Sequence, residues 1–362
     1  MGVEILWLMP VHPIGFPNRK GSMGSYYSIS DHKGINPEFG NFDDFRALVN
    51  TAHEMGMKVI LDWVANHAAW DHVWTKTNPE FFVRNENGFV SPYDWTDVIQ
   101  IDHNNHDQQN AMIDAMNFWV KEFKIDGFRA DLAHLTPLAF WIKARHEVDS
   151  ENKLVWLAES EEPSYAEAFD ILFTWKWMHF AQEHVGKRNG ETFRDFLLSD
   201  TIPGLRLFFI SNHDENSWNG TEYEKYGIYA QALAVLSCTW KHSIPLIYSG
   251  QEIPNQKRLQ FFEKDHLEWK EPKLHEFYKT LLQLRRSELF STEAAFSVLD
   301  AAPGLFVYKR EMNDGSLIVI LNFSGSTSAY PVPGNYIDVF TGTAVSDGEL
   351  MIEPAGYQVL LR

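Results

Sequence analysis

Two carboxylic acids stand out because each of them closes a short apolar segment. Asp131 ends the segment 125–131, and Glu159 ends the segment 154–159. A pair of carboxyl groups at one site can supply a nucleophile and a proton donor. Arg129 lies two residues before Asp131, and a period of two puts both side chains on the same face of a strand. A guanidinium at that distance favours the ionised carboxylate, which is the form that attacks as a nucleophile.

Glu159 follows the apolar residues 154–158, so its carboxyl group is expected to lie against apolar walls. Such surroundings favour the protonated form that a proton donor needs. Both patterns also have a structural explanation that stays open on these residues alone. Arg129 and Asp131 would then form only a buried ion pair, and Glu159 would cap the helix that follows it.

Two further polar clusters also follow apolar segments. They are Asp62 with Asn66 and His67, and His213 with Asp214. Taken alone, a histidine in such a cluster is usually structural, and Asn66-His67 is also a sequence that turns use. All four clusters nevertheless occupy the same position, at the end of an apolar segment. This agreement favours one shared site.

The segments that position these residues are short and apolar, as buried parallel strands are. They are residues 5–9, 58–62, 125–131, 154–159, 206–210 and 243–248. Apolar residues at helical spacing lie between them, which predicts crossover helices. Such repeats favour a parallel sheet, either closed as a (β/α)8 barrel of the TIM type or open and doubly wound. We predict the barrel, because its strands end at one mouth and because no Gly-rich phosphate loop follows an early strand.

The predicted barrel domain covers residues 1–292. Its segment 67–105 is long and rich in Asn, Asp and aromatic residues, which predicts a small irregular lobe. Residues 293–362 are predicted to form a C-terminal antiparallel β-sandwich domain. Within it, alternating residues at 305–310 and 317–323 flank Asn313-Asp314-Gly315, a strong hairpin signal.

Composition excludes several classes of protein. The formal net charge of −18 disfavours nucleic acid as a partner. Cys238 is the only cysteine, so neither an intrachain disulfide nor a thiolate zinc site is expected. No apolar segment reaches the roughly 18 residues of a membrane span. Residues 1–8 do not have the pattern of a secretion signal, and the sequence leaves both the compartment and the oligomeric state open.

In their order along the chain, the four clusters resemble the conserved regions of the α-amylase family of glycoside hydrolases, family 13. The matching segments are Asp62-Trp-Val-Ala-Asn66-His67, Gly127-Phe-Arg129-Ala-Asp131-Leu-Ala-His134, Val155-Trp-Leu-Ala-Glu159 and Ile210-Ser-Asn-His213-Asp214. The resemblance implies a (β/α)8 barrel and retaining, double-displacement cleavage of α-1,4-glucosidic bonds. The implied substrates are starch-like α-glucans or malto-oligosaccharides, and the chemistry requires no cofactor.

The resemblance also implies roles for single residues. Asp131 is expected as the nucleophile, Glu159 as the general acid/base and Asp214 as a third carboxylate that binds sugar hydroxyls. The expected substrate-binding residues are Tyr27, with Tyr26 as the alternative, and His67, Arg129, His134 and His213. Asp62 is expected to organise the site without touching substrate. His134 stands where α-amylases often carry a lysine, so the acceptor side departs from the family pattern.

Many α-amylases bind calcium between barrel and lobe, through the Asn matched by Asn66 and an Asp in a Pro-Asp-Leu-Asp stretch. This chain has Ile99-Gln100-Ile101-Asp102 there. Replacing a carboxylate by an amide removes charge that a hard cation favours. Calcium binding through Asn66 therefore stays an open alternative.

The chain opens almost directly on what resembles the second strand of the family, so the first strand and the first helix are expected to be missing. Either the chain is part of a longer protein, or its barrel is open and exposes two parallel edges. The alternatives to α-1,4 hydrolysis are transglycosylation, α-1,6 cleavage and a catalytically silent α-glucan-binding fragment.

Overall fold

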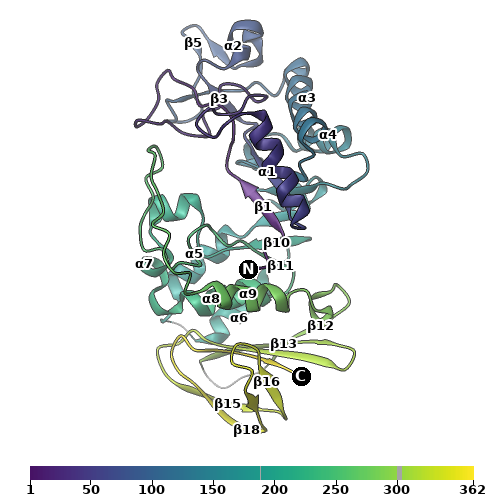
Figure 1. Ribbon diagram of the computed structural model, residues 1–362, viewed down its shortest axis with the longest axis vertical. Helices are drawn as coiled ribbons and strands as arrows, with labels where there is room; N and C mark the ends of the chain where they lie inside the picture. The colour runs from purple at the N-terminus through teal and green to yellow at the C-terminus, as the bar shows by residue number, and fades with distance from the viewer. Residues whose placement is uncertain (188, 300–303) are drawn as a thin grey trace. The chain divides into compact units, whose positions relative to one another are not determined.

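The computed structural model describes residues 1–187, 189–299 and 304–362, and its contacts divide the chain into two compact units (Figure 1). The N-terminal unit consists of Val3–Phe173 and Gln260–Asp265. The C-terminal unit consists of Met1–Gly2, Thr174–Leu259 and His266–Arg362. The boundary predicted near residue 293 stays a prediction, because the contacts group the strands after it with the helices of 174–259.

The N-terminal unit contains a parallel sheet in the order β1-β2-β7-β8-β9. Its strands are β1 (Ile5–Leu8), β2 (Lys58–Trp63), β7 (Gly127–Ala130), β8 (Val155–Ala158) and β9 (Ile171–Phe173). Four of them coincide with predicted apolar segments, whereas β9 was not predicted from the sequence. Gly127 allows β7 to approach β8, because a Cβ atom at this position would lie 2.0 Å from the Val155 carbonyl oxygen.

Three helices accompany this sheet, namely α1 (Phe42–Glu54), α3 (His106–Phe123) and α4 (Leu138–Val148). Helix α1 begins at a capping box in which Asn41 and Asp44 bind each other's backbone N–H groups. Asn105 caps α3, which ends at Lys124 in the left-handed conformation. Two 3-10 turns, η2 (Ala133–Leu135) and η3 (Pro163–Glu167), follow β7 and β8.

The segment predicted as a lobe forms a small group of short elements after β2. They are β3 (His67–Ala69), α2 (Val73–Thr77), η1 (Pro79–Phe81), β4 (Arg84–Asn85), β5 (Gly88–Phe89) and β6 (Val98–Gln100). Strands β3 and β6 pair antiparallel and bring His67 opposite Gln100. The two ends of the lobe are thereby joined just beyond the carboxyl end of β2.

The C-terminal unit begins with helices and a parallel strand pair. The helices are α5 (Trp175–His184), α6 (Gly190–Ser199), α7 (Glu222–Tyr226), α8 (Ala230–Thr239) and α9 (His275–Leu284), with η4 (Glu215–Asn219), η5 (Gly227–Tyr229) and η6 (Glu288–Phe290). Strand β10 (Leu205–Phe208) pairs with β11 (Ser243–Pro245). Helix α8 is almost wholly buried and contributes to one apolar core together with strands of the antiparallel sheet.

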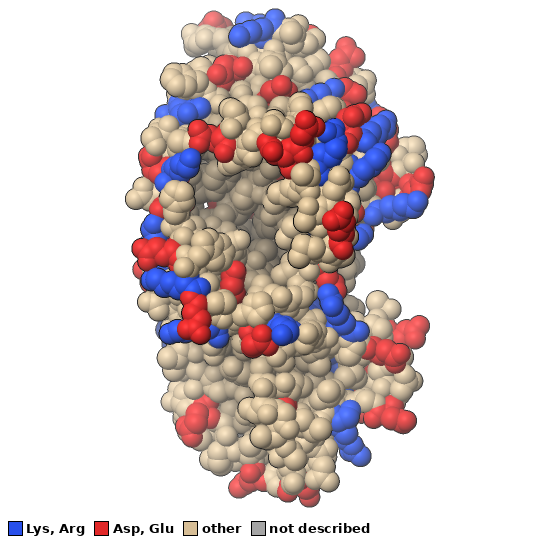
Figure 2. All heavy atoms as spheres, in the orientation of Figure 1, with Lys and Arg blue, Asp and Glu red and all other residues tan. Residues whose placement is uncertain are grey.

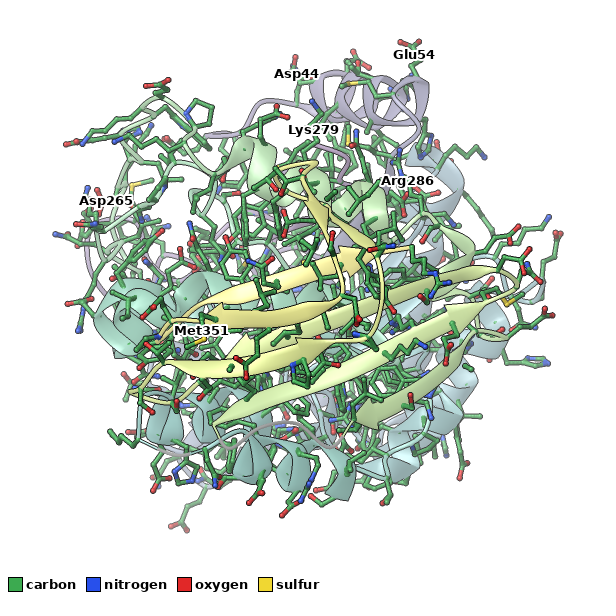
Figure 3. All side chains as sticks on the ribbon, turned by 90° about the horizontal axis from the view of Figure 1, so that it is seen from below. Asp44, Glu54, Asp265, Lys279, Arg286 and Met351 are labelled. Carbon is green, nitrogen blue, oxygen red and sulfur yellow. The ribbon has the colours of Figure 1, made fainter. Side chains whose placement is uncertain are left out.

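The remaining strands of this unit are antiparallel (Figure 3). They are β12 (Ala295–Leu299), β13 (Leu305–Met312), β14 (Gly315–Asn322), β15 (Ser328–Val332), β16 (Tyr336–Asp338), β17 (Ala344–Val345), β18 (Gly348–Ile352) and β19 (Tyr357–Leu361). Six of them form a sheet in the order β12-β13-β14-β19-β16-β17, and β15 pairs with β18. The predicted hairpin is present, with Asn313 at a positive φ of 53° between β13 and β14. An apolar core with members from β13, β14, β15 and β18 joins the two sheets.

Charged side chains of both signs are mixed on the surface over α3 and α4 (Figure 2). Ion pairs join Lys33 to Asp114 and Lys143 to Glu147 in this region. The face shown therefore presents no extended basic surface of the kind that binds nucleic acid. Within the described ranges, no helix combines the length and the apolar character needed to cross a membrane.

Candidate active site

Asp131 and Glu159 each stand one residue beyond a strand of the parallel sheet. The backbone N–H of Asp131 donates to the Trp63 carbonyl oxygen at 3.0 Å, and that of Glu159 donates to the Ala130 carbonyl oxygen at 3.0 Å. The sheet hydrogen bonds thus continue through both residues. Since Ala130 and Ala158 are paired in register, the two carboxylic acids occupy equivalent positions on neighbouring strands.

A single guanidinium joins the predicted carboxylates of this unit. Arg129 is fully buried, and its Nη1 lies 2.8 Å from Asp62 Oδ1 and 3.0 Å from Asp131 Oδ1. Its Nη2 lies 2.8 Å from Glu159 Oε2. Burying an arginine without partners would be very costly, whereas three carboxylates supply the opposite charge that such burial requires.

The surroundings of Arg129 keep it charged. Burial by itself lowers the pKa of the guanidinium, but the charges of Asp62 and Glu159, with smaller electrostatic contributions from Tyr27 and Asp131, outweigh it and raise the pKa well above its usual value. Three aromatic rings enclose the same group, with Arg129 Cζ 5.0 Å from the ring centre of Trp7, 5.6 Å from that of Phe173 and 6.0 Å from that of Tyr27.

Tyr27 and Asp62 are joined by hydrogen bonds at the same place. The Tyr27 hydroxyl donates to Asp62 Oδ2 at 3.1 Å, and Trp7 Nε1 donates to the same oxygen at 3.1 Å. Arg129 Nη1 reaches the Tyr27 oxygen at 3.4 Å. The neighbouring Tyr26 instead packs against Phe261, with ring centres 4.8 Å apart. The structure therefore brings the Tyr27 hydroxyl to the carboxylate of Asp62.

Glu159 has more polar surroundings than the apolar walls expected from the sequence. Besides Arg129, its Oε2 accepts a hydrogen bond from the backbone N–H of Leu132 at 2.7 Å. Leu132 adopts the left-handed conformation, with φ 40° and ψ 49°, which costs a non-glycine residue about 1 kcal/mol. This strained turn directly after Asp131 aims an N–H group at the neighbouring carboxylate.

His67 is buried at the start of the lobe. Burial lowers its pKa to about 4, so the imidazole is neutral near pH 7. Asn66 Nδ2 lies 3.3 Å from His67 Nδ1, and the Trp95 ring meets the imidazole edge-on with ring centres 5.5 Å apart. His134 lies in η2 and is exposed, and its Nδ1 is 3.5 Å from the Glu159 carbonyl oxygen, at the outer limit of a hydrogen bond.

The Asn66 side chain does not offer its oxygen to a cation. Gln100 Nε2 donates to Asn66 Oδ1 at 3.0 Å and to the Asn66 carbonyl oxygen at 2.9 Å. An N–H donor thus binds both oxygens of Asn66, so the residues present do not fit a calcium ion. Among the described residues, no group of three or more His, Cys, Asp or Glu side chains is arranged to hold a metal.

His213 and Asp214 belong to the C-terminal unit, where they follow β10. His213 is buried, and its Nε2 lies 3.1 Å from Asp214 Oδ2. The Asp214 side chain is one-third exposed. Burial and the charge of Asp214 raise the pKa of Tyr248 to about 12, so this hydroxyl keeps its proton near Asp214. The His213–Asp214 pair therefore combines an accessible carboxylate with a buried histidine that the carboxylate holds in place.

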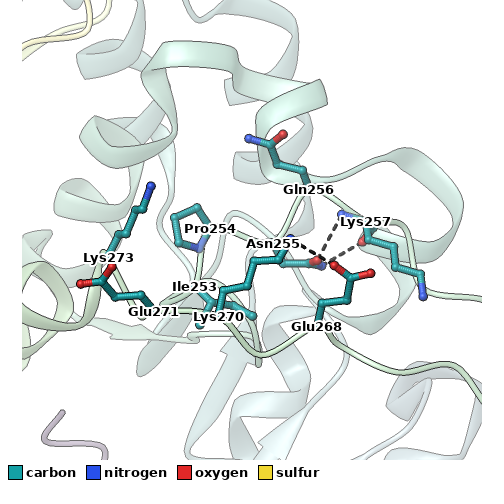
Figure 4. Close-up of a pocket in the computed structure, with 9 residues that line it drawn as sticks. All are labelled: Ile253, Pro254, Asn255, Gln256, Lys257, Glu268, Lys270, Glu271 and Lys273. Carbon is teal, nitrogen blue, oxygen red and sulfur yellow. Dashed lines mark hydrogen bonds and ion pairs between the residues drawn. The ribbon is translucent and has the colours of Figure 1, made fainter.

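A separate cavity of about 520 Å³ in the same unit is lined by the segments 253–257 and 268–273 (Figure 4). Its walls mix lysine, glutamate and amide side chains, and Asn255 binds the backbone of Lys257. None of the predicted site residues lines it.

Three contributors to the site were missed in the sequence. Trp7 and Phe173 enclose Arg129, and Gln100 binds Asn66. Trp7 and Phe173 lie in strands of the sheet, and the position of Trp7 near the end of an apolar segment was a usable signal. Gln100 was noticed in the sequence only because it stands in a stretch where many α-amylases carry an aspartate.

Comparison with known proteins gives matches over the whole chain. A family model described as "Alpha amylase, catalytic domain" matches residues 1–97, and one described as "Beta-galactosidase C-terminal domain" matches residues 304–362. The structure of a noncanonic maltogenic alpha-amylase AmyB from Thermotoga neapolitana is 28% identical, with a TM-score of 0.90 over 100% of this chain and 90% of that one. An alpha-amylase structure from Lactobacillus plantarum is also 28% identical, with a TM-score of 0.89 over 99% and 91% of the two chains.

Curated relatives include an alpha-amylase and maltosyltransferases. Alpha-amylase 2 of Dictyoglomus thermophilum is 22% identical over 100% of this chain and 68% of its own length. The alpha-1,4-glucan:maltose-1-phosphate maltosyltransferase of Rhodospirillum rubrum is 30% identical over 59% of this chain and 34% of its own length. The match thus spans two thirds of the first relative and one third of the second. These likenesses confirm the predicted fold class, a partial TIM-type barrel with a C-terminal β-sandwich.

Proposed function

Because the chain belongs to the α-amylase family of glycoside hydrolases, family 13, we propose that it is a retaining glycosidase that cleaves α-1,4-glucosidic bonds in starch-like α-glucans or malto-oligosaccharides. One observation carries the proposal. Asp131 and Glu159 occupy equivalent positions on neighbouring parallel strands and bind the same guanidinium.

The spacing of the two acids supports retention over inversion. Neighbouring strands of a sheet lie about 4.8 Å apart. Retaining glycosidases hold their two carboxyl groups about 5–5.5 Å apart, whereas inverting enzymes need about 6.5–9.5 Å to admit a water molecule. Equivalent positions on β7 and β8 therefore suit a direct attack on the sugar better than an attack through water.

The proposed reaction has two displacement steps. A carboxylate oxygen of Asp131 attacks the anomeric carbon, and the bond to the leaving sugar breaks as Glu159 gives its proton to the glycosidic oxygen. This step leaves a glycosyl ester on Asp131. Glu159, now a carboxylate, takes a proton from water as the water oxygen attacks the anomeric carbon and the ester bond breaks. Two inversions at the same carbon retain its configuration.

Arg129 has opposite effects on the two acids in this scheme. Its contact with Asp131 stabilises the ionised nucleophile, which the first step requires. Its contact with Glu159 stabilises a carboxylate where the first step requires a proton. We therefore expect substrate binding to loosen the contact between Arg129 and Glu159, so that Glu159 carries its proton to the glycosidic oxygen.

The remaining predicted residues would bind the sugar. Tyr27 offers a ring beside the carboxylates, and the neutral His67 offers a hydrogen bond. Asp214 and His213 keep their expected roles as sugar-binding residues of the C-terminal unit, and the exposed His134 would face the acceptor sugar. A neutral carbohydrate also fits a strongly acidic protein better than a polyanion does.

A second candidate function is the transfer of the glycosyl group to a sugar acceptor in place of water. The likeness to the maltosyltransferase of Rhodospirillum rubrum favours it. Both functions share the first displacement step and differ only in what attacks the glycosyl ester. Products longer than the substrate would identify transfer.

The test is incubation of the purified protein with maltoheptaose, with product lengths followed by chromatography and the anomer of fresh product followed by NMR. Shorter products of α configuration would support the proposal, and β-configured products would contradict it. Asp131→Asn should abolish turnover, because it removes the nucleophile at almost constant volume. Glu162→Gln, an exposed neighbour of Glu159, is the matched control and should remain active. A folded wild-type protein without turnover would instead support a silent glucan-binding fragment.

A further inference from the structure

Three oxygen atoms converge on one nitrogen at the base of the lobe. Gln100 Nε2 lies 2.9 Å from the Asn66 carbonyl oxygen, 3.0 Å from Asn66 Oδ1 and 3.3 Å from the Ile101 carbonyl oxygen. Gln100 ends β6, directly opposite His67 in β3. Its amide thus lies where the two ends of the lobe meet.

The orientation of this amide follows from its neighbours. All three oxygens are hydrogen-bond acceptors, so only a hydrogen-bond donor or a cation can lie between them. A rotation of the Gln100 amide by half a turn would aim its own oxygen at the other three. A convergence of carbonyl oxygens is also the geometry in which proteins bind hard cations.

The carboxylates close to β6 in the sequence are engaged elsewhere. Asp102 Oδ1 accepts hydrogen bonds from the backbone and the side chain of Asn104, at 2.9 and 3.0 Å. Asp97 pairs with Lys20 at 2.9 Å. The group around Gln100 Nε2 therefore consists of neutral oxygens, which suits a neutral donor better than a divalent cation.

We propose that the Gln100 amide takes the place of a metal ion at the base of the lobe and, through Asn66, fixes the tautomer of His67. The lobe is thereby held to the barrel strand β2 by a built-in donor, and its stability does not depend on calcium.

The second part of the proposal follows from the Asn66 amide. Because Asn66 Oδ1 accepts from Gln100, Nδ2 is the atom that lies 3.3 Å from His67 Nδ1. An amide nitrogen only donates, so His67 Nδ1 must accept and the imidazole proton must sit on Nε2. Gln100 is thus a positioning residue that acts through Asn66. That His67 Nε2–H then donates to a sugar hydroxyl rests on the proposed function.

The first test is thermal unfolding of the full chain in calcium chloride and in a chelator. The wild-type melting temperature should be the same in both. Gln100→Glu removes the donor and adds a negative charge between the oxygens, so this variant should melt lower in the chelator and recover in calcium. Gln256→Glu, at an exposed side chain (Figure 4), is the matched control and should respond to neither condition.

Two results of that test would overturn the proposal. One is a wild-type protein that loses stability in the chelator, because a bound cation would then be present. The other is a folded Gln100→Glu variant that calcium does not stabilise. Should the variant fail to fold, the wild-type measurement still decides whether the lobe depends on a cation.

The second test reads the His67 tautomer by long-range proton–nitrogen NMR, with the signal assigned by its loss in His67→Gln. A proton on Nε2 supports the relay through Asn66, and a proton on Nδ1 refutes it. Replacing Gln100 by Ala should allow both tautomers to appear. None of these readouts requires turnover, so their failure is distinguishable from failure of the proposed function.

Discussion

Acidification should destabilise this protein steeply, because several histidines are buried in neutral form. His12 and His32 are almost fully buried with ring centres 5.8 Å apart, and His32 Nδ1 lies 2.9 Å from His72 Nε2. Burial lowers the pKa of His12 to about 3 and that of His32 to about 4. It also lowers the pKa values of His67 and His103 to about 4 each.

The sign of the effect follows from proton binding. An unfolded histidine takes up a proton near pH 6.5, whereas these folded histidines stay neutral until about pH 4 or below. The unfolded state therefore binds more protons in this range, and the free energy of unfolding falls as the pH falls from about 6.5 toward about 4. For a pKa shift of this size, each histidine lowers the free energy of unfolding by about 2 kcal/mol as the pH falls from 7 to 5.

Glu222 works in the opposite direction. Burial raises its pKa to about 7, so its folded form binds a proton in this pH range and its unfolded form does not. Protonation of Glu222 therefore raises the free energy of unfolding by about 2 kcal/mol as the pH falls from 7 to 5. Together, the four histidines and Glu222 lower the free energy of unfolding by about 6 kcal/mol, which is a large part of the stability of a typical domain. Burial also lowers the pKa of His72, which adds to the loss.

His12→Phe tests this reasoning with little change in packing. The His12 ring meets those of Trp63 and Trp119 edge-on, and its buried Nε2 has no hydrogen-bond partner among the described residues. In urea unfolding at pH 7, 6 and 5, the variant should lose about 2 kcal/mol less than the wild type. The exposed His146→Gln is the control. Parallel curves for His12→Phe and the wild type would refute the reasoning.

Three further predictions concern the candidate site. Arg129→Met should lower the free energy of unfolding, measured in urea, by about 3–5 kcal/mol, because it removes the cation that pairs with three buried carboxylates. A loss of stability no larger than that caused by an Arg→Met substitution at an exposed position would contradict this prediction. Glu159→Gln should lose activity on maltoheptaose but keep far more on α-glucosides with good leaving groups, and an equal loss would exclude it as the acid. Phe261→Ala should raise KM more than it lowers kcat, because its ring supports Tyr27, and Phe261→Tyr should restore KM.

The parts of the site that could be predicted from the sequence all follow from the geometry of a parallel sheet. In a parallel sheet the strands end on the same side, so Asp62, Arg129, Asp131 and Glu159 had to lie close together once their segments were recognised as strands. Four sheet strands of the N-terminal unit were long and apolar enough to be recognised. Strand β9 has only three residues, which is too short for a periodicity to show.

The missed features depend on side-chain direction. Glu159 was expected among apolar residues because its sequence neighbours are apolar, but its polar partners, Arg129 and the Leu132 N–H, come from β7 and the turn after it. The contact with the Leu132 N–H arises from a backbone conformation that leucine rarely adopts. Likewise, the order Ile99-Gln100-Ile101 showed that a carboxylate was missing, but not that the amide would turn toward Asn66.

Three carboxylates around one guanidinium have a consequence for inhibitors. With Asp62 and Asp131 ionised and Glu159 protonated, as the first step requires, the group carries one more negative charge than positive ones. A glycosidic bond breaks through a transition state in which the sugar ring becomes positively charged, and this surplus attracts such a ring more than the neutral ground state. Sugar analogues with a basic nitrogen in the ring should therefore bind more tightly than their neutral counterparts, and added salt should weaken that preference little, because the charges are buried.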